Sequence, residues 1–223
     1  MLSQIKKILS LRIYDLGGIL FDEKGFEFNL HKEHPEAPLS PNYVDLRGVF
    51  RNREMRIMIA GLMMPEIMKM KPDRLIDLPE SATPLITTLS DMTGIEMISL
   101  RSEVLKGGIK DHGTKKIING NFEPGQTALL IDDVVSSFAF TKFKAIPILR
   151  SVGLVLLSTV CVVIDREEGG EEKLAQEGFK LKSLLGLHSD VTKYCIEAGV
   201  ASEKIRQMSL DFAKAAKKYA LAV

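Results

Sequence analysis

Between Pro72 and Leu185 the chain alternates short apolar segments with helical segments, and this alternation limits the possible folds more than any other feature. The segments 127–135 and 154–164 are almost continuously apolar. Strands of this kind must be covered on both faces, so we expect an α/β fold with a Rossmann-like parallel sheet flanked by helices. Ligands bind at the carboxyl ends of the strands in such sheets. Here those ends are the loops after Leu78, Leu100, Val135 and Asp165.

Hydrophobic spacing and helix-breaking residues predict the other elements. Further strands are expected at 43–46, 75–78, 96–100 and 179–185. Helices are expected at 2–16, 53–71, 84–93 and 141–152 and twice near the C-terminus, and the polar segment 22–41 is expected to form strands and loops. A length of 223 residues predicts a single domain. The expected elements divide it into an N-terminal segment with a helix, strands and loops (1–50), an α/β core (51–187) and C-terminal helices (188–223).

Charge and cysteine content exclude several classes of function. Lys and Arg number 30 against 29 for Asp and Glu, so no overall positive field attracts nucleic acid or a membrane surface, and any bound anion must be held by a local cluster. No segment is long and apolar enough to cross a membrane or to act as a signal peptide. The two cysteines, Cys161 and Cys195, are expected to be reduced thiols in a cytoplasmic protein.

The sharpest chemical signal is the strand end Leu129-Leu130-Ile131-Asp132-Asp133-Val134-Val135-Ser136-Ser137. Adjacent strand residues face opposite ways, so one of the two carboxylates can point at a ligand while the other anchors the loop. Carboxylates accept hydrogen bonds from ribose hydroxyls or hold a divalent ion. Ser136, Ser137 and Thr141, with the amides of the next helix, suit a phosphate monoester. The alternative is an ordinary strand end with Asp and Ser caps.

A basic, glycine-bearing loop forms the second candidate site. It carries Arg101, Lys106, Lys110, His112, Lys115 and Lys116. Cations on a loop suit a leaving pyrophosphate, where negative charge develops in the transition state. A solvated basic loop is the alternative interpretation.

The third candidate site is Asp165-Arg166-Glu167-Glu168, which follows a buried strand. The guanidinium of Arg166 can pair with a carboxylate or stack on a planar base. The two glutamates can equally form a turn surface.

In this order, the three sites resemble one family, the orotate phosphoribosyltransferases, which have the type I phosphoribosyltransferase fold. The resemblance implies that residues 1–50 form an N-terminal helix and a small hood segment. Further motifs in order along the chain carry the resemblance. They are Ser40-Pro41-Asn42-Tyr43-Val44-Asp45-Leu46-Arg47-Gly48, Pro79 with Ala82-Thr83-Pro84-Leu85, Thr93-Gly94-Ile95, and Lys110-Asp111-His112-Gly113-Thr114-Lys115-Lys116.

The resemblance implies transfer of a phosphoribosyl group from 5-phosphoribosyl 1-diphosphate to orotate, giving orotidine 5′-phosphate and pyrophosphate on the route to UMP. Mg²⁺ is the implied cofactor, and it is expected to bind through the diphosphate with no direct protein ligand. The transition state resembles an oxocarbenium ion. The resemblance also implies a homodimer in which the basic loop serves the neighbouring subunit's site.

The resemblance further assigns roles to individual residues. Catalytic roles fall on Lys110, His112, Asp132 and Asp133. The residues expected to bind the donor, 5-phosphoribosyl 1-diphosphate, are Arg101, Ser102, Lys110, His112, Asp132, Asp133, Val134, Val135, Ser136, Ser137, Phe138, Ala139, Phe140 and Thr141. The residues expected to bind orotate are Asn42, Tyr43, Ser136 and Arg166. Either Lys32 or His31 is expected to occupy the position of a lysine that the family has in its N-terminal segment.

Several positions depart from the family pattern, and all of them lie in the expected site. Phe138-Ala139-Phe140 replaces a glycine-bearing phosphate loop. Asp77 and Glu80 place carboxylates near the expected pyrophosphate, where a lysine is common. Ser102 stands in place of a lysine, and an insertion that includes 105–109 lengthens the basic loop.

These departures leave two alternatives beside an orotate phosphoribosyltransferase. One is a transferase of the same fold that acts on another base. The other is a non-catalytic member that binds a nucleotide or regulates a partner.

Overall fold

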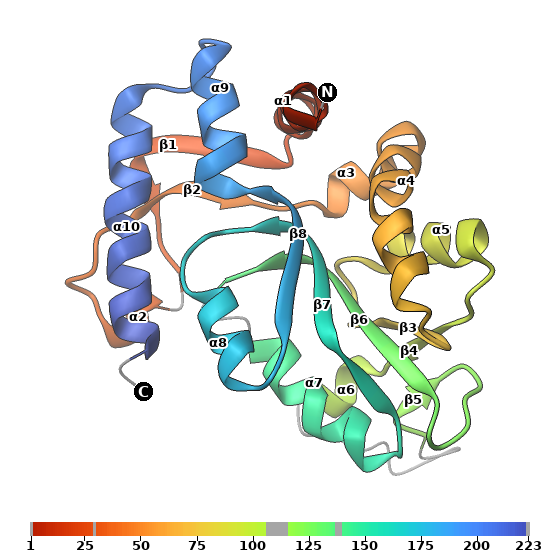
Figure 1. The fold of residues 1–223 in the computed structure, drawn as a ribbon. Helices are drawn as coiled ribbons and strands as arrows, with labels where there is room; N and C mark the ends of the chain where they lie inside the picture. Colours follow the sequence, from red (N-terminus) through yellow and green to blue (C-terminus); the bar gives the residue numbers. More distant parts are fainter. Residues whose placement is uncertain (1, 29, 106–115, 137–139, 222–223) are drawn as a thin grey trace.

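The computed structural model describes residues 2–28, 30–105, 116–136 and 140–221. They form a six-stranded and a two-stranded sheet with helices packed around them (Figure 1). The N-terminal elements are α1 (Leu2–Asp15), β1 (Ile19–Phe26), α2 (Leu30–Glu33), β2 (Ser40–Val44), α3 (Arg47–Arg51) and α4 (Arg53–Met70). The central elements are β3 (Arg74–Asp77), α5 (Thr83–Thr93), β4 (Met97–Leu100), α6 (Ser102–Leu105), β5 (Ile118–Asn119), β6 (Thr127–Val135) and α7 (Phe140–Ser151). The C-terminal elements are β7 (Val155–Asp165), α8 (Gly170–Gln176), β8 (Lys180–Gly186), the π-helix η1 (Leu187–Thr192), α9 (Lys193–Glu197) and α10 (Glu203–Leu221).

The large sheet has the strand order β5-β4-β3-β6-β7-β8. Its pairings β3–β4, β3–β6, β6–β7 and β7–β8 are parallel, as the alternation of strands and helices predicts. The edge strand β5, which was not expected from the sequence, is antiparallel to β4. β5 begins beside the carboxyl end of β4, where Ile118 lies opposite Leu100, and it therefore runs in the direction opposite to β4.

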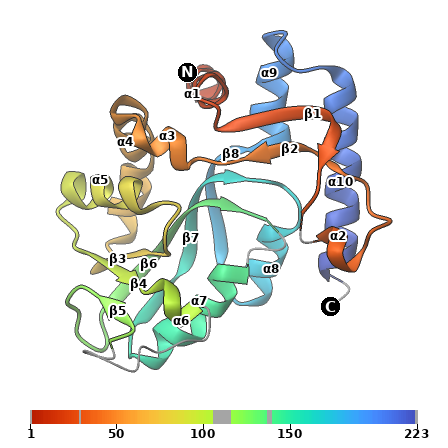
Figure 2. The same cartoon turned by 180° about the vertical axis from the view of Figure 1, so that it is seen from behind.

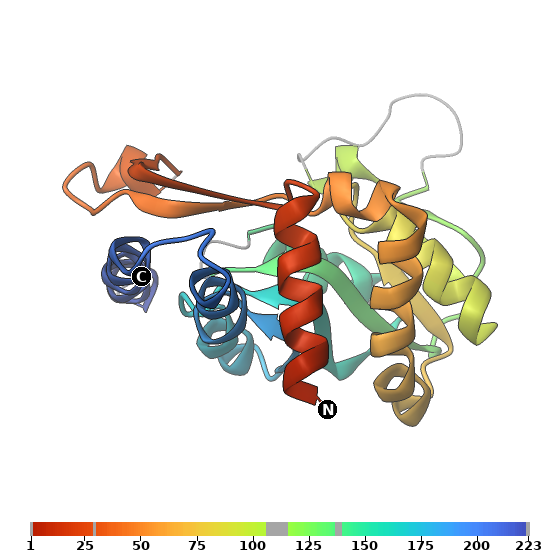
Figure 3. The same cartoon turned by 90° about the horizontal axis from the view of Figure 1, so that it is seen from above.

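Both faces of the large sheet are buried, which confirms the interpretation of its apolar strands. Leu129 and Ile131 of β6 pack in a core with α1, α3, α4 and α5, and Figure 3 shows α1 and α4 lying over this face. Ala128 and Leu130 alternate with them and pack in a second core with α7 and α8. The period-two alternation of side chains along β6 thus supplies both layers.

The strands β1 and β2 pair antiparallel and, with α2, form a small unit that we call the hood. A third hydrophobic cluster joins it to α10 through Leu30, Ala37, Phe212 and Ala216, and Figure 2 shows α2 and the hairpin beside α10. The strand expected at 43–46 instead covers Ser40–Val44, because Pro41 is tolerated in a two-stranded ribbon and Leu46 begins the turn into α3. The hood therefore packs on the C-terminal helix.

No helix in the described part of the chain is long and apolar enough to span a membrane. Both cysteines are free and buried, and burial raises the pKa of each thiol to about 12. These thiols are therefore protonated at neutral pH.

Candidate active site

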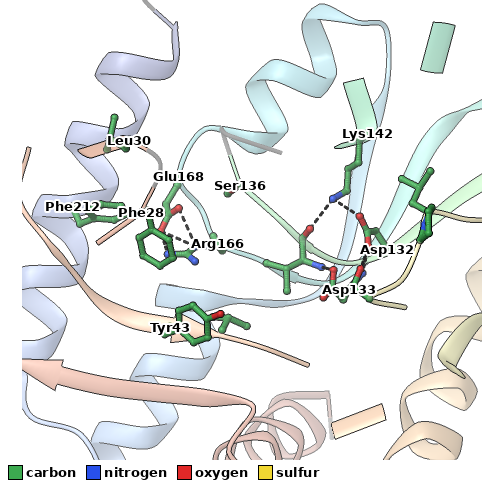
Figure 4. Close-up of a pocket in the computed structure, with 15 residues that line it drawn as sticks. Phe28, Leu30, Tyr43, Asp132, Asp133, Ser136, Lys142, Arg166, Glu168 and Phe212 are labelled. Atoms are coloured by element: carbon green, nitrogen blue, oxygen red, sulfur yellow. Dashed lines mark hydrogen bonds and ion pairs between the residues drawn. The ribbon is translucent and has the colours of Figure 1, made fainter. Parts of the chain in front are cut away.

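A cavity of about 420 Å³ opens at the carboxyl ends of β3, β6 and β7 and is closed on one side by the hood (Figure 4). The loops that follow these three strands form part of its wall, together with side chains from β2, α2 and α10. The lining residues are Phe28, Leu30, Tyr43, Val44, Leu78, Pro79, Ser81, Asp132, Asp133, Val134, Ser136, Lys142, Arg166, Glu168 and Phe212. The topology thus brings the first and third sequence motifs to one place.

Asp132 lies in a buried network on one side of the cavity. Its Oδ2 is 2.6 Å from Lys142 Nζ, and the two side chains are only 7% and 3% exposed. Its Oδ1 accepts hydrogen bonds from Ser81 Oγ at 3.0 Å and from the Asp133 amide at 2.8 Å. Burial raises the pKa of Asp132, but the charge of Lys142 and the hydrogen bonds from Asp133 and Lys142 lower it by more. The pKa of Asp132 therefore lies below its ordinary value, and the carboxylate is ionised.

Asp133 has a different environment. Its Oδ1 accepts a hydrogen bond from the Val134 amide at 2.8 Å. Burial, followed by the negative charge of Asp132, raises the pKa of Asp133 to about 7. Two neighbouring carboxylates with separated pKa values are typical of functional sites.

Lys142 was not identified from the sequence. It lies in the first turn of α7, and its Nζ also donates to the Val134 carbonyl oxygen at 2.7 Å. The positive end of the helix dipole disfavours a lysine in this turn. The sequence therefore offers this unfavourable helix position as a signal, but it does not indicate the contact with Asp132.

Arg166 lies across the cavity from the aspartates, with Ser136 between them (Figure 4). Its Nε is 3.0 Å from each carboxylate oxygen of Glu168, and its Nη2 is 2.9 Å from Glu168 Oε1. The guanidinium carbon lies 4.8 Å from the centre of the Phe28 ring, which stacks on Tyr43. This half of the cavity therefore offers a flat aromatic wall and a cation, which together suit a planar ring.

The structure corrects the expectation for Asp77. This carboxylate is 2% exposed and does not line the cavity. It accepts hydrogen bonds from Thr83 Oγ1 at 3.0 and 2.8 Å and from Ser99 Oγ at 3.0 Å, and burial raises its pKa. Asp77 therefore fixes the start of α5 instead of facing a pyrophosphate, whereas Glu80, after a cis Pro79–Glu80 peptide, is exposed.

Other predicted residues lie away from the cavity. Asn42 is buried and its Nδ2 donates to Ser209 Oγ of α10 at 2.7 Å, so only Tyr43 of that pair reaches the cavity. Arg101 Nε donates to Asn119 Oδ1 at 2.9 Å, across the β4–β5 edge. Lys32 and His31 line a separate hollow of the hood.

The remaining predicted residues divide into two groups. Ser102 begins α6, Val134 and Ser136 line the cavity, Val135 is part of the core, and Phe140 and Thr141 begin α7. Lys106, Lys110, His112, Lys115, Ser137, Phe138 and Ala139 lie outside the described residues.

Holding a divalent ion is the other role that paired carboxylates can have. Within the described ranges, no group of three or more His, Cys, Asp or Glu side chains is arranged to hold one. Asp132 already has partners on both oxygens. The carboxylates of the cavity therefore do not form a metal-binding cluster of their own.

Comparisons with known proteins agree on one family. No protein-family model matches the sequence. The orotate phosphoribosyltransferase of Pyrococcus abyssi is 32% identical over 163 residues, which are 72% of this chain and 84% of that protein. The uridine 5′-monophosphate synthase of Bos taurus is 34% identical over 170 residues, 75% of this chain, and the chain spans only 34% of that longer protein. The structure of Leishmania donovani UMP synthase has a TM-score of 0.77 at 24% identity, covering 93% of this chain and 42% of that one, which shows the same fold.

Proposed function

Because the chain belongs to the orotate phosphoribosyltransferase family of pyrimidine biosynthesis, we propose that its cavity is where the phosphoribosyl group passes from 5-phosphoribosyl 1-diphosphate (PRPP) to orotate. The carbon–oxygen bond to pyrophosphate breaks and a bond from the ribose carbon to a ring nitrogen of orotate forms. The products are orotidine 5′-phosphate and pyrophosphate. Positive charge develops on the ribose in the transition state, so a nearby carboxylate stabilises it.

The single observation that carries this proposal is the placement of paired aspartates and Arg166 on one cavity, with Ser136 between them. The donor's ribose is assigned to the aspartate side. Its 5-phosphate is assigned to Ser136 and the start of α7, because the Ser136 hydroxyl and the amide groups of a helix start suit a phosphate.

Orotate is assigned to the opposite side. Its ring fits against Phe28 and Tyr43, and its carboxylate fits beside the guanidinium of Arg166. Phe212 of α10 and Leu30 of α2 complete the apolar wall, so the hood and the C-terminal helix exclude water from the base.

We further propose that the active form is a cytoplasmic homodimer, in which Arg101, Lys110 and His112 of one subunit neutralise pyrophosphate in the other. Arg101 does not line the cavity of its own subunit, which supports this assignment. Mg²⁺ would arrive with the diphosphate, supplying positive charge to the leaving group.

The test is consumption of orotate, followed by ultraviolet absorbance with PRPP and Mg²⁺. We expect turnover by the unmutated protein and at least about a hundredfold loss in Asp133→Asn, since a charge-assisted hydrogen bond contributes roughly 1.5–3 kcal/mol and a charge opposite the oxocarbenium ion is lost as well. Asp73→Asn is the matched control, because Asp73 is exposed and bonds Thr127 at the amino end of β6. Equal activity of the two variants would contradict the assignment.

A second candidate function is transfer to an uncharged base. The ion pair between Arg166 and Glu168 favours it, because Glu168 already neutralises the cation that an anionic base needs. Comparing orotate with uracil as acceptor in the same assay separates the two, and faster turnover of uracil would favour this candidate.

A further inference from the structure

The two aspartates of the cavity differ in how many of their acceptor positions are already occupied. Asp132 Oδ2 bonds Lys142 Nζ, and Asp132 Oδ1 bonds both Ser81 Oγ and the Asp133 amide. Asp133 accepts one backbone hydrogen bond, from the Val134 amide to Oδ1, and its carboxyl group also interacts with that of Asp132, but it forms no ion pair with Lys142. Both side chains line the same cavity, so access to a ligand is decided by these partners.

Releasing Asp132 toward a sugar would be unfavourable. Lys142 is 3% exposed, so its ammonium would lose its counter-ion in a place with little access to water. Removing one partner of a buried ion pair is strongly destabilising, because the other charge is left uncompensated. Asp133 can turn its carboxylate to a ligand without leaving a buried ammonium unpaired, because Lys142 pairs with Asp132.

Building on the proposed function, we propose that Lys142 withdraws Asp132 from substrate binding, so that Asp133 alone contacts the ribose hydroxyls and Asp132 is a positioning residue. This division differs from the family resemblance, which assigns the ribose to both carboxylates. It also makes Lys142 a second positioning residue.

The same network explains what Asp132 positions. Ser81 belongs to the loop after β3, Asp132 to β6 and Lys142 to α7. Lys142 Nζ also holds the Val134 carbonyl at 2.7 Å, two residues before Ser136. One buried ion pair therefore connects the loop after β3, the strand assigned to ribose and the helix start assigned to phosphate.

The test uses a double variant that removes both charges and keeps the shape, Asp132→Asn with Lys142→Met. The introduced asparagine still presents an acceptor to Ser81 and to the Asp133 amide, and no buried charge is left alone. We expect the dissociation constant for PRPP with Mg²⁺, measured by isothermal titration calorimetry, to rise by about threefold or less. In Asp133→Asn it should rise by about ten- to a hundredfold.

The melting temperature of the single variant Lys142→Met, compared with that of the double variant, measures how much the ion pair contributes to stability. Lys142→Met alone should lower the melting temperature, and adding Asp132→Asn should restore most of it. A KM for PRPP that changes little in the double variant, while kcat falls severalfold, is the pattern expected of positioning.

A measurement on the unmutated protein covers the case in which the double variant does not fold. In carboxyl-carbon NMR, PRPP should shift the Asp133 resonance and leave that of Asp132 nearly unchanged. Loss of PRPP binding in the double variant as large as in Asp133→Asn, or a shift at Asp132, overturns the inference. If the unmutated protein binds no PRPP at all, the proposed function fails, and this assignment fails with it.

Discussion

Arg166 and Glu168 form an ion pair inside the cavity, with the two side chains 8% and 3% exposed. The Nε and Nη2 groups of Arg166 point at Glu168, and Nη2 also approaches Ser40 Oγ at 3.5 Å. Burial raises the pKa of Glu168 above its ordinary value, and the charge and hydrogen bond of Arg166 offset this only in part. An anionic base that enters this half of the cavity therefore meets a guanidinium whose charge is already balanced.

Glu168→Gln should strengthen orotate binding. Glutamine keeps an acceptor for Arg166 but leaves the buried cation without a counter-ion, and the carboxylate of orotate then supplies one. We expect KM for orotate to fall about fivefold, which corresponds to about 1 kcal/mol. The melting temperature of the variant without orotate should fall, and orotate should raise it by more than it does in the unmutated protein.

Glu167→Gln is the matched control for this prediction. Glu167 Oε2 accepts hydrogen bonds from the His188 and Ser189 amides and does not line the cavity. Its substitution should leave KM for orotate within about twofold. A rise of KM in Glu168→Gln would mean that Glu168 serves only to hold Arg166 in place.

PRPP binding should depend on pH through Asp133. Its pKa is raised to about 7 by burial and by Asp132, while Lys142 opposes the shift and Arg47 also interacts with its charge. The ionised form accepts hydrogen bonds from ribose hydroxyls, so kcat/KM for PRPP should rise through pH 7 and level off above about pH 8. Asp73→Asn should keep this profile, and a profile that is flat between pH 6 and 8 would contradict the assignment.

The same carboxyl group should make stability fall as pH rises. Its pKa in the folded state lies above the ordinary value of 3.8, so the folded protein holds the proton more tightly between about pH 4 and 7. The stabilisation is fully present below that window and is lost as pH rises through it. Asp133→Asn should therefore melt several degrees higher than the unmutated protein at pH 8. Equal melting temperatures at pH 8 would show that the charge of Asp133 is solvated.

Asp77 should prove to be a stability residue. Asp77→Ala removes the acceptor of Thr83 and Ser99 and should lower the free energy of unfolding by about 2–3 kcal/mol in urea. Asp77→Asn retains an acceptor and loses a buried charge, so it should cost less than about 1 kcal/mol. If Asp77→Asn instead weakens pyrophosphate binding strongly without loss of stability, the carboxylate acts on the ligand.

Gly18→Ala should destabilise the junction of α1 and the hood. A Cβ at this position meets Val49 Cγ2 and lies 2.9 Å from Ile13 Cγ2 and 3.0 Å from the Ile13 carbonyl oxygen. Overpacking of this kind costs typically about 1–3 kcal/mol, to be measured by urea unfolding. Gly48→Ala is the control, because nothing lies within 4 Å of a Cβ there, and it should be neutral or slightly stabilising.

Mixing two inactive variants tests the proposed homodimer. Lys110→Ala removes a cation of the basic loop, and Asp133→Asn removes the ribose carboxylate. If the loop serves the neighbouring subunit, half of the randomly mixed dimers carry one intact site, and the mixture should regain about a quarter of the activity. A mixture that stays inactive after verified subunit exchange would place loop and cavity in one subunit.

The sequence by itself determined the layered fold and the first candidates. Apolar strands such as 127–135 and the glycines after Leu16 are local signals, and they predicted the main strands and the first helix to within a few residues. Asp132, Asp133 and Arg166 were found because strand ends gather at one edge of a parallel sheet.

Only the tertiary structure decided which of these side chains already have partners. Lys142 meets Asp132, and Ser99 meets Asp77, across separate strands and helices, so no spacing in the sequence indicates either contact. Buried charges and hydroxyls must find partners wherever the packed backbone brings them, because water cannot reach them. Local periodicity therefore determined the elements of this protein, while long-range burial decided which carboxylate of the pair is left for a ligand.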